Sequence, residues 1–166
     1  VLKEPGRLAT SLSYLCVQGG GPRDAPIVLY DYDPSRSGEV PARLLEGFTG
    51  ILQTDGYEGY AAVGRWPGVV HAGCWAHSRR KFDEAVKALP ASGRPSKASR
   101  ALEALRIIQE IYAVERSIPK DAPHEERRRV REERSKPFVQ ELRRWLDTAL
   151  PQVPPQTLTG KAFGYL

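Results

Sequence analysis

The chain has 166 residues, of which 40% are hydrophobic and 27% charged, so it can bury a core in one domain and has no long apolar run. A net charge of +5 suits a polyanionic partner, although an ordinary solvated basic surface explains the same excess. No signal peptide or membrane span is visible, and two cysteines without a secretory signal indicate reduced thiols, so we expect a cytoplasmic protein.

The first ninety residues alternate between predicted strands and predicted helices. Residues 12–17 and 27–32 are rich in β-formers, and the glycine-rich break between them predicts an antiparallel hairpin. A short helix should begin near Pro41 and end at Gly47 or Gly50. A strand at 51–54, a short helix at 57–63 and a strand at 69–74 follow, and this alternation favours parallel neighbours.

The remaining residues are predicted to be helical. Apolar spacing predicts a helix over 76–89, and prolines and glycines then mark a boundary near residue 90. Residues 96–150 predict a helical hairpin, in which Pro137 kinks the second helix. The expected organisation is therefore a core at 1–90, a helical insertion at 91–150 and a linker with the start of a further segment at 151–166.

Asp55 is the leading candidate for a catalytic or metal-binding residue. It follows the apolar run 51–54 and precedes Gly56, so it is expected at the carboxyl end of a strand, where open α/β sheets bind ligands. Carboxylate oxygens suit hard cations such as Mg²⁺. The alternative is a simple turn residue, and we favour a loop-starting role for Asp31 and Asp33.

Cys74 and His77 are three residues apart, which is the spacing of one half of a zinc site, but no second half is visible. A thiol nucleophile with a histidine base is a further reading, and a buried cysteine with a cleft-lining histidine is the ordinary one.

Two basic clusters are candidate DNA contacts. Arg79, Arg80 and Lys81 lie in the first turn of a predicted helix, where cations oppose the macrodipole and a phosphate would compensate them, and solvated surface cations are an equally open alternative. The denser run 127–134 is interleaved with glutamates, so we favour an exposed, ion-paired helix face over a DNA-tracking surface there.

Several longer motifs carry a family resemblance when they are taken in order. They are Leu2-Lys3-Glu4-Pro5-Gly6-Arg7, the segment 30–38, Leu52-Gln53-Thr54-Asp55-Gly56-Tyr57-Glu58-Gly59-Tyr60, the segment 73–82 and the closing Thr159-Gly160-Lys161-Ala162. Over essentially its whole length the chain resembles bacterial transposases of the insertion sequence 66 family.

The resemblance implies an α/β fold: a ribonuclease H-like mixed sheet of about five strands with flanking helices, plus an all-helical insertion. It also implies an Asp-Asp-Glu site in which two Mg²⁺ or Mn²⁺ ions support DNA cleavage and strand transfer. Asp55 matches the second carboxylate, and Cys74 and His77 would lie beside the catalytic crevice. The chain begins at Val1 and contains no Met, so we expect an inactive fragment that holds Mg²⁺ weakly through one carboxylate.

The expected partners are DNA, namely transposon ends and target, and a second copy of the chain, with no membrane. An alternative is a non-catalytic nucleic-acid-binding or assembly module. A zinc-stabilised domain built on Cys74 and His77 is a third reading.

Overall fold

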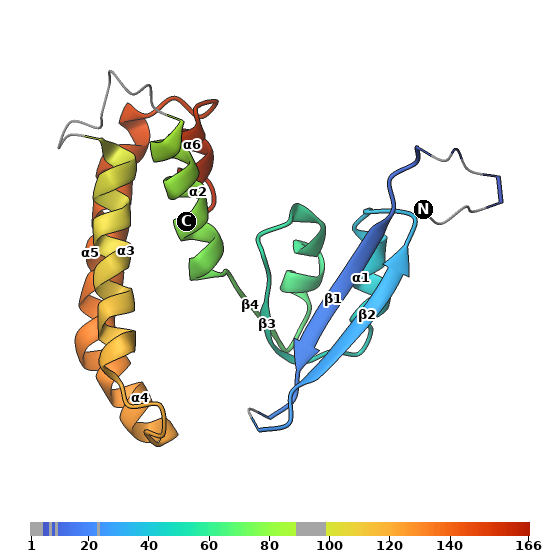
Figure 1. Cartoon of the computed structure of the whole chain (residues 1–166), viewed down its shortest axis with the longest axis horizontal. Helices are drawn as coiled ribbons and strands as arrows, with labels where there is room; N and C mark the ends of the chain where they lie inside the picture. Colours follow the sequence, from blue (N-terminus) through green and yellow to red (C-terminus); the bar gives the residue numbers. More distant parts are fainter. Residues whose placement is uncertain (1–4, 7, 9, 23, 89–98) are drawn as a thin grey trace. The chain divides into compact units, whose positions relative to one another are not determined.

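The computed structural model describes residues 5–6, 8, 10–22, 24–88 and 99–166, which belong to two compact units. The sheet unit comprises residues 1–72 and the helical unit residues 73–166. Both small sheets belong to the first unit and the long helices to the second (Figure 1). The boundary expected near residue 90 lies outside the described residues, and the three-part division of the chain stays a prediction.

The sheet unit begins with an antiparallel hairpin, as predicted. Strand β1 (Tyr14–Gly20) pairs with β2 (Ile27–Asp33), so that Tyr14 lies opposite Asp33 and Gly20 opposite Ile27. Gly21 opens the turn with a φ of +85°, a conformation that favours glycine. A side chain at Gly21 would also lie 2.9 Å from the carbonyl oxygen of Ala25, so the turn is closed to larger residues.

A parallel pair of strands forms the rest of the sheet unit. Helix α1 (Glu39–Leu44) leads into strand β3 (Gly50–Gln53), which pairs in parallel with β4 (Val69–Ala72), Gly50 lying opposite Val69. The short helix expected at 57–63 is instead two 3₁₀ turns, η1 (Glu58–Tyr60) and η2 (Val63–Arg65). These turns return the chain to the edge of β3 in few residues, which tight 3₁₀ geometry permits.

The prediction of a ribonuclease H-like mixed sheet of about five strands is wrong. The described residues form four strands in two separate sheets, β1 with β2 and β3 with β4. Alternating apolar residues predict where strands lie but not which edges pair, because pairing between sheets depends on backbone hydrogen bonds between distant segments. The chain between the hairpin and β3 instead forms a loop and α1.

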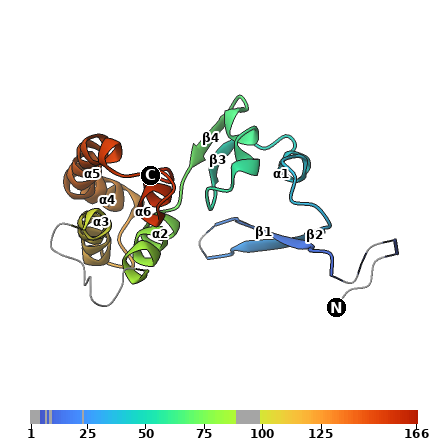
Figure 2. The same cartoon turned by 90° about the horizontal axis from the view of Figure 1, so that it is seen from above.

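The helical unit consists of packed helices, which Figure 2 shows nearly end-on. They are α2 (Trp75–Lys87), α3 (Arg100–Ser117), α4 (His124–Val130), α5 (Lys136–Ala149) and α6 (Leu158–Phe163). Helices α3 and α5 lie side by side in Figure 1 and pack together, which confirms the predicted helical hairpin. Among the described residues, no helix is both long and apolar enough to cross a bilayer. The buried cluster that joins α2, α3, α5 and α6 contains Phe82, Ala85, Ala101, Ala104, Ile108, Leu142, Leu146, Ala149, Ala162 and Phe163.

The hairpin's second arm contains a π-helical segment, η4 (Arg131–Ser135), directly before the start of α5. Pro137 lies in the first turn of α5 and has no N–H to donate to the carbonyl group four residues earlier. A π turn accommodates such a break by shifting the hydrogen-bond ladder by one residue. The irregularity expected at Pro137 is therefore a π segment. A final 3₁₀ turn, η5 (Leu150–Gln152), follows α5.

Candidate functional site

Asp55 lies just beyond the carboxyl end of β3, where the sequence predicts it. The backbone N–H of Thr54 still donates to the carbonyl of Ala72 at 3.0 Å, and Thr54 is buried, whereas Asp55 is exposed. Its Oδ1 accepts a hydrogen bond of 3.0 Å from the backbone N–H of Tyr57. The carboxylate therefore closes a turn through one oxygen, and its exposed side chain remains accessible to a ligand.

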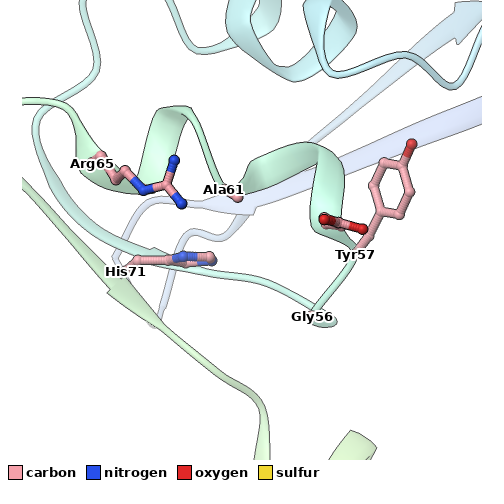
Figure 3. Close-up of a pocket in the computed structure, with 7 residues that line it drawn as sticks. Gly56, Tyr57, Ala61, Arg65 and His71 are labelled. Carbon is pink, nitrogen blue, oxygen red and sulfur yellow. The ribbon is translucent and has the colours of Figure 1, made fainter. Parts of the chain in front are cut away.

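A pocket of about 370 Å³ adjoins the turn that follows Asp55 (Figure 3). Arg65 on η2 and His71 on β4 both line it. The imidazole Nε2 of His71 lies 2.9 Å from the hydroxyl oxygen of Thr54, which fixes the ring at the pocket wall. A Cβ on Gly64 would lie 2.8 Å from Cγ of His71, so the ring packs directly on glycine backbone. The residues around the pocket are Gly56, Tyr57, Glu58, Ala61, Gly64, Arg65 and His71.

The two other strand-end carboxylates of the sheet unit are bound by an arginine. Arg43 on α1 donates to Asp31 at 3.3 Å and to Asp33 at 3.0 Å, so one cation separates two like charges. These two hydrogen bonds raise the pKa of Arg43. Asp33 also accepts a hydrogen bond of 2.7 Å from the N–H of Ser35, in agreement with its predicted loop-starting role.

The described residues contain no group of three or more acidic, histidine or cysteine side chains arranged to hold a metal ion. Asp55 is thus the type of ligand that Mg²⁺ takes, but the described residues supply one such ligand and no complete cage.

Cys74 and His77 belong to the helical unit, where Cys74 is the residue before α2. Its carbonyl oxygen accepts hydrogen bonds of 3.0 Å from the N–H groups of His77 and Ser78, which starts the helix. Both side chains are half-buried, and Nδ1 of His77 has no hydrogen-bond partner among the described residues. The structure thus assigns the backbone of Cys74 a capping role, and the chemical role of the two side chains stays open.

The three cations on α2 have different surroundings, because successive helical residues point about 100° apart. Arg79 is exposed and makes no ion pair within 4 Å among the described residues, although, after the hydrogen bond from Lys87, its charge contributes to lowering the pKa of Asp83. Arg80 lies 3.9 Å from Glu84. Lys81 is half-buried, and its Nζ lies 5.2 Å from the centre of the Tyr165 ring. Arg79 is therefore the cation of this cluster most available to a phosphate.

The run 127–134 is largely engaged within the helical unit. Arg127 donates to the carbonyl oxygens of Pro119, Lys120 and Ala122, which ties α4 to the preceding loop. Arg131 and Glu115 pair at 2.5 Å, and this bond lowers the pKa of Glu115. Arg129 pairs with Glu133 at 3.0 Å. These contacts confirm the expected ion-paired helix face.

Arg36 and Tyr57 form a contact that sequence reasoning missed. The guanidinium carbon of Arg36 lies 4.0 Å from the centre of the Tyr57 ring, and Tyr57 packs edge-to-face on Tyr60. Burial raises the pKa of Tyr60, with smaller contributions from Cys16 and Asp55. Both Arg36 and Tyr57 lie in motifs of the family resemblance, but no local spacing pairs residues so far apart.

The chain matches the model of the family described as "Transposase IS66 family" over residues 1–166. It is 33% identical to the uncharacterized protein y4jD of Sinorhizobium fredii, over 98% of this chain and 32% of that protein. It is 36% identical to the uncharacterized protein y4hP of the same organism, over 73% of this chain and 23% of that protein. The chain thus spans about a quarter to a third of the length of these relatives. No solved structure matches. Since the family model covers all 166 residues, the chain belongs to the IS66 family of transposases.

Proposed function

We propose that the chain is part of the catalytic region of a DNA transposase and that Asp55 is one of its metal-binding carboxylates. The observation that carries this proposal is an exposed carboxylate at the end of β3 in a member of this family. A pocket whose lining begins at the next residue, Gly56, adjoins this edge, although Asp55 itself does not line it.

Mg²⁺ or Mn²⁺, held in part by Asp55, would supply the charge that activates an attacking hydroxyl and stabilises a leaving oxygen. The chain's own residues contribute fixed geometry. The bond from the N–H of Tyr57 holds Oδ1 of Asp55, and the His71–Thr54 contact fixes the residue before it. These two contacts favour one orientation of the carboxylate, so it would need little reorganisation when DNA binds.

DNA contact is the second part of the proposal. Arg79 and Arg80 are exposed on α2 and suit phosphate oxygens, while Lys81 is half-buried with its Nζ near the Tyr165 ring. We assign the phosphate contact chiefly to Arg79, since Arg80 shares its charge with Glu84.

The test is DNA cleavage by the complete protein that contains this chain, with Asp55→Asn compared with Asp24→Asn. Asp24 is exposed in the hairpin turn and matches the change in charge and shape. Asp55→Asn should lower the cleavage rate at least about a hundredfold, because losing a metal ligand costs several kcal/mol of transition-state stabilisation. Asp24→Asn should cleave like the wild type.

Retained DNA binding by Asp55→Asn, measured by fluorescence anisotropy, would separate the chemical role from folding. Undiminished cleavage by this variant would end the claim for Asp55. A wild-type protein that binds DNA but never cleaves it with Mg²⁺ or Mn²⁺ would favour the non-catalytic binding module.

A further inference from the structure

Arg36 lies in the loop between β2 and α1, and its guanidinium lies close to two aromatic rings. Its guanidinium carbon is 4.0 Å from the centre of the Tyr57 ring and 5.9 Å from that of Tyr14. Both distances lie within the range in which a cation is attracted to the face of a ring. Arg36 is nevertheless exposed, so its charge faces solvent as well as the rings.

Tyr57 is itself fixed from several sides. Its hydroxyl donates to the backbone carbonyl of Arg36, so the ring and the loop hold each other. Its backbone N–H donates to Oδ1 of Asp55. Its ring lies so close to Gly59 that a Cβ there would be 2.9 Å from Cζ of Tyr57. The guanidinium of Arg36 is therefore positioned by the same residue that closes the Asp55 turn.

Contact between a guanidinium carbon and a ring face does not use up the N–H donors of the guanidinium. The five N–H donors lie in the plane of the group, and they suit the paired oxygens of a phosphate. Among the described residues, no acceptor receives a hydrogen bond from the side chain of Arg36, whereas Arg43 is bonded to both Asp31 and Asp33. Arg36 thus combines a side chain held near the Tyr57 ring with N–H donors that are available to a phosphate.

We propose that Arg36 binds a phosphate group of the DNA strand on which Asp55 acts, and that Tyr57 is the positioning residue that links the two. This inference rests on the proposed function, because it assigns the ligand of the same edge of the sheet unit. A phosphate held at Arg36 would place the neighbouring part of the strand beside the Asp55 turn at low entropic cost.

The experiment measures binding of a fluorescein-labelled DNA duplex to the complete protein across a salt series, without divalent cations. Arg36→Gln should weaken binding and lower the magnitude of the salt slope by about one, since one phosphate contact is lost. Arg36→Lys should keep the slope but bind more weakly, because an ammonium group cannot form the two parallel hydrogen bonds to a phosphate that a planar guanidinium forms. Tyr57→Phe keeps the ring and should also weaken binding at an unchanged slope.

Arg116→Gln is the matched control, because it removes the same charge from an exposed position on α3. Circular dichroism identifies any variant that fails to fold, and Arg36→Lys then carries the test. If Arg36→Gln and Arg36→Lys both bind like the wild type, with unchanged slopes, the inference is overturned. Loss of cleavage in Asp55→Asn alongside such a result would leave the proposed function standing. A wild type that binds no DNA would overturn both.

Discussion

Different kinds of interaction stabilise the inside of each of the two units. The helical unit buries a continuous apolar cluster centred on Phe82 and Ile108, neither of which is exposed. In the sheet unit, the buried apolar side chains among the described residues are few, with Val40 and Val63 the principal ones. The strand side chains there are largely exposed, as in Leu29 at 58% and Ile51 at 73%.

The sheet unit instead depends on directed contacts between side chains and turns. They include the Arg36–Tyr57 stack, the Arg43 bridge and the Thr54–His71 bond. Such contacts place groups accurately but stabilise a fold less than buried apolar area does. The candidate site lies in this unit, which agrees with the general tendency of functional regions to come from the less stable parts of a protein.

The largest expected effect is the loss of a core side chain. Phe82→Ala should destabilise the helical unit by about 3–5 kcal/mol, because it empties a fully buried site beside Phe163. Ile51→Thr, which keeps a β-branched residue at an exposed strand position, should change the stability of the sheet unit by about 0.5 kcal/mol or less. Native-state hydrogen exchange measures both effects, through the amides of α3 and of β4. Equal losses in the two variants would contradict the comparison.

A smaller effect is expected where two backbone segments touch. A Cβ on Gly160 of α6 would lie 2.8 Å from Cα of Pro155 and would also collide with the carbonyl oxygen of Pro154. Gly160→Ala should therefore destabilise the helical unit by about 1–3 kcal/mol, since backbone yields less easily than a side chain. Gly164→Ala is the control, because its nearest neighbours lie 3.8 Å away. Urea unfolding followed by circular dichroism gives the free energy of unfolding of both variants. If Gly160→Ala is as stable as the wild type, the close packing of α6 on Pro154 and Pro155 is contradicted.

The smallest of the three expected losses of stability concerns a charged contact inside the helical unit. Oε2 of Glu103 accepts hydrogen bonds from Nε1 of Trp145 at 2.8 Å and from Arg100 at 2.9 Å. Both hydrogen bonds hold the pKa of Glu103 below its usual value, and the bond from the Trp145 indole makes the larger contribution. A lowered pKa adds stability above the unfolded pKa, and this stability is lost as the pH falls through the folded value.

Glu103→Gln should accordingly lower the free energy of unfolding by about 1 kcal/mol at neutral pH, because the carboxylate is partly exposed and its contacts are screened by water. The difference from the wild type should shrink in acid once the pH falls through the usual glutamate range and then below the folded pKa. Unfolding free energies measured across this pH range give the test. A difference that stays constant down to the lowest pH would mean that packing, and not the ionised carboxylate, is the source.

Much of the local structure could be predicted from the sequence, because periodicity and glycine or proline breaks act within a few residues. The hairpin, the parallel β3–β4 pair and the α3–α5 hairpin are examples. The prediction of a single sheet of about five strands is wrong, because which strand edges pair depends on contacts between segments that are distant in the sequence. The exposed turn position of Asp55 followed from the run 51–56. The Arg36–Tyr57 stack did not, since its partners are separated by a loop, a helix and a strand.

The Arg43 bridge changes how formal charge is distributed along the sheet unit. Three aspartates lie at strand ends, yet Asp31 and Asp33 share the guanidinium of Arg43, so the group of Arg43, Asp31 and Asp33 has a net formal charge of minus one. Asp55 contributes another minus one and has no ion pair among the described residues. Of these three strand-end carboxylates, Asp55 is therefore the one from which an incoming cation would have no bound cationic side chain to displace.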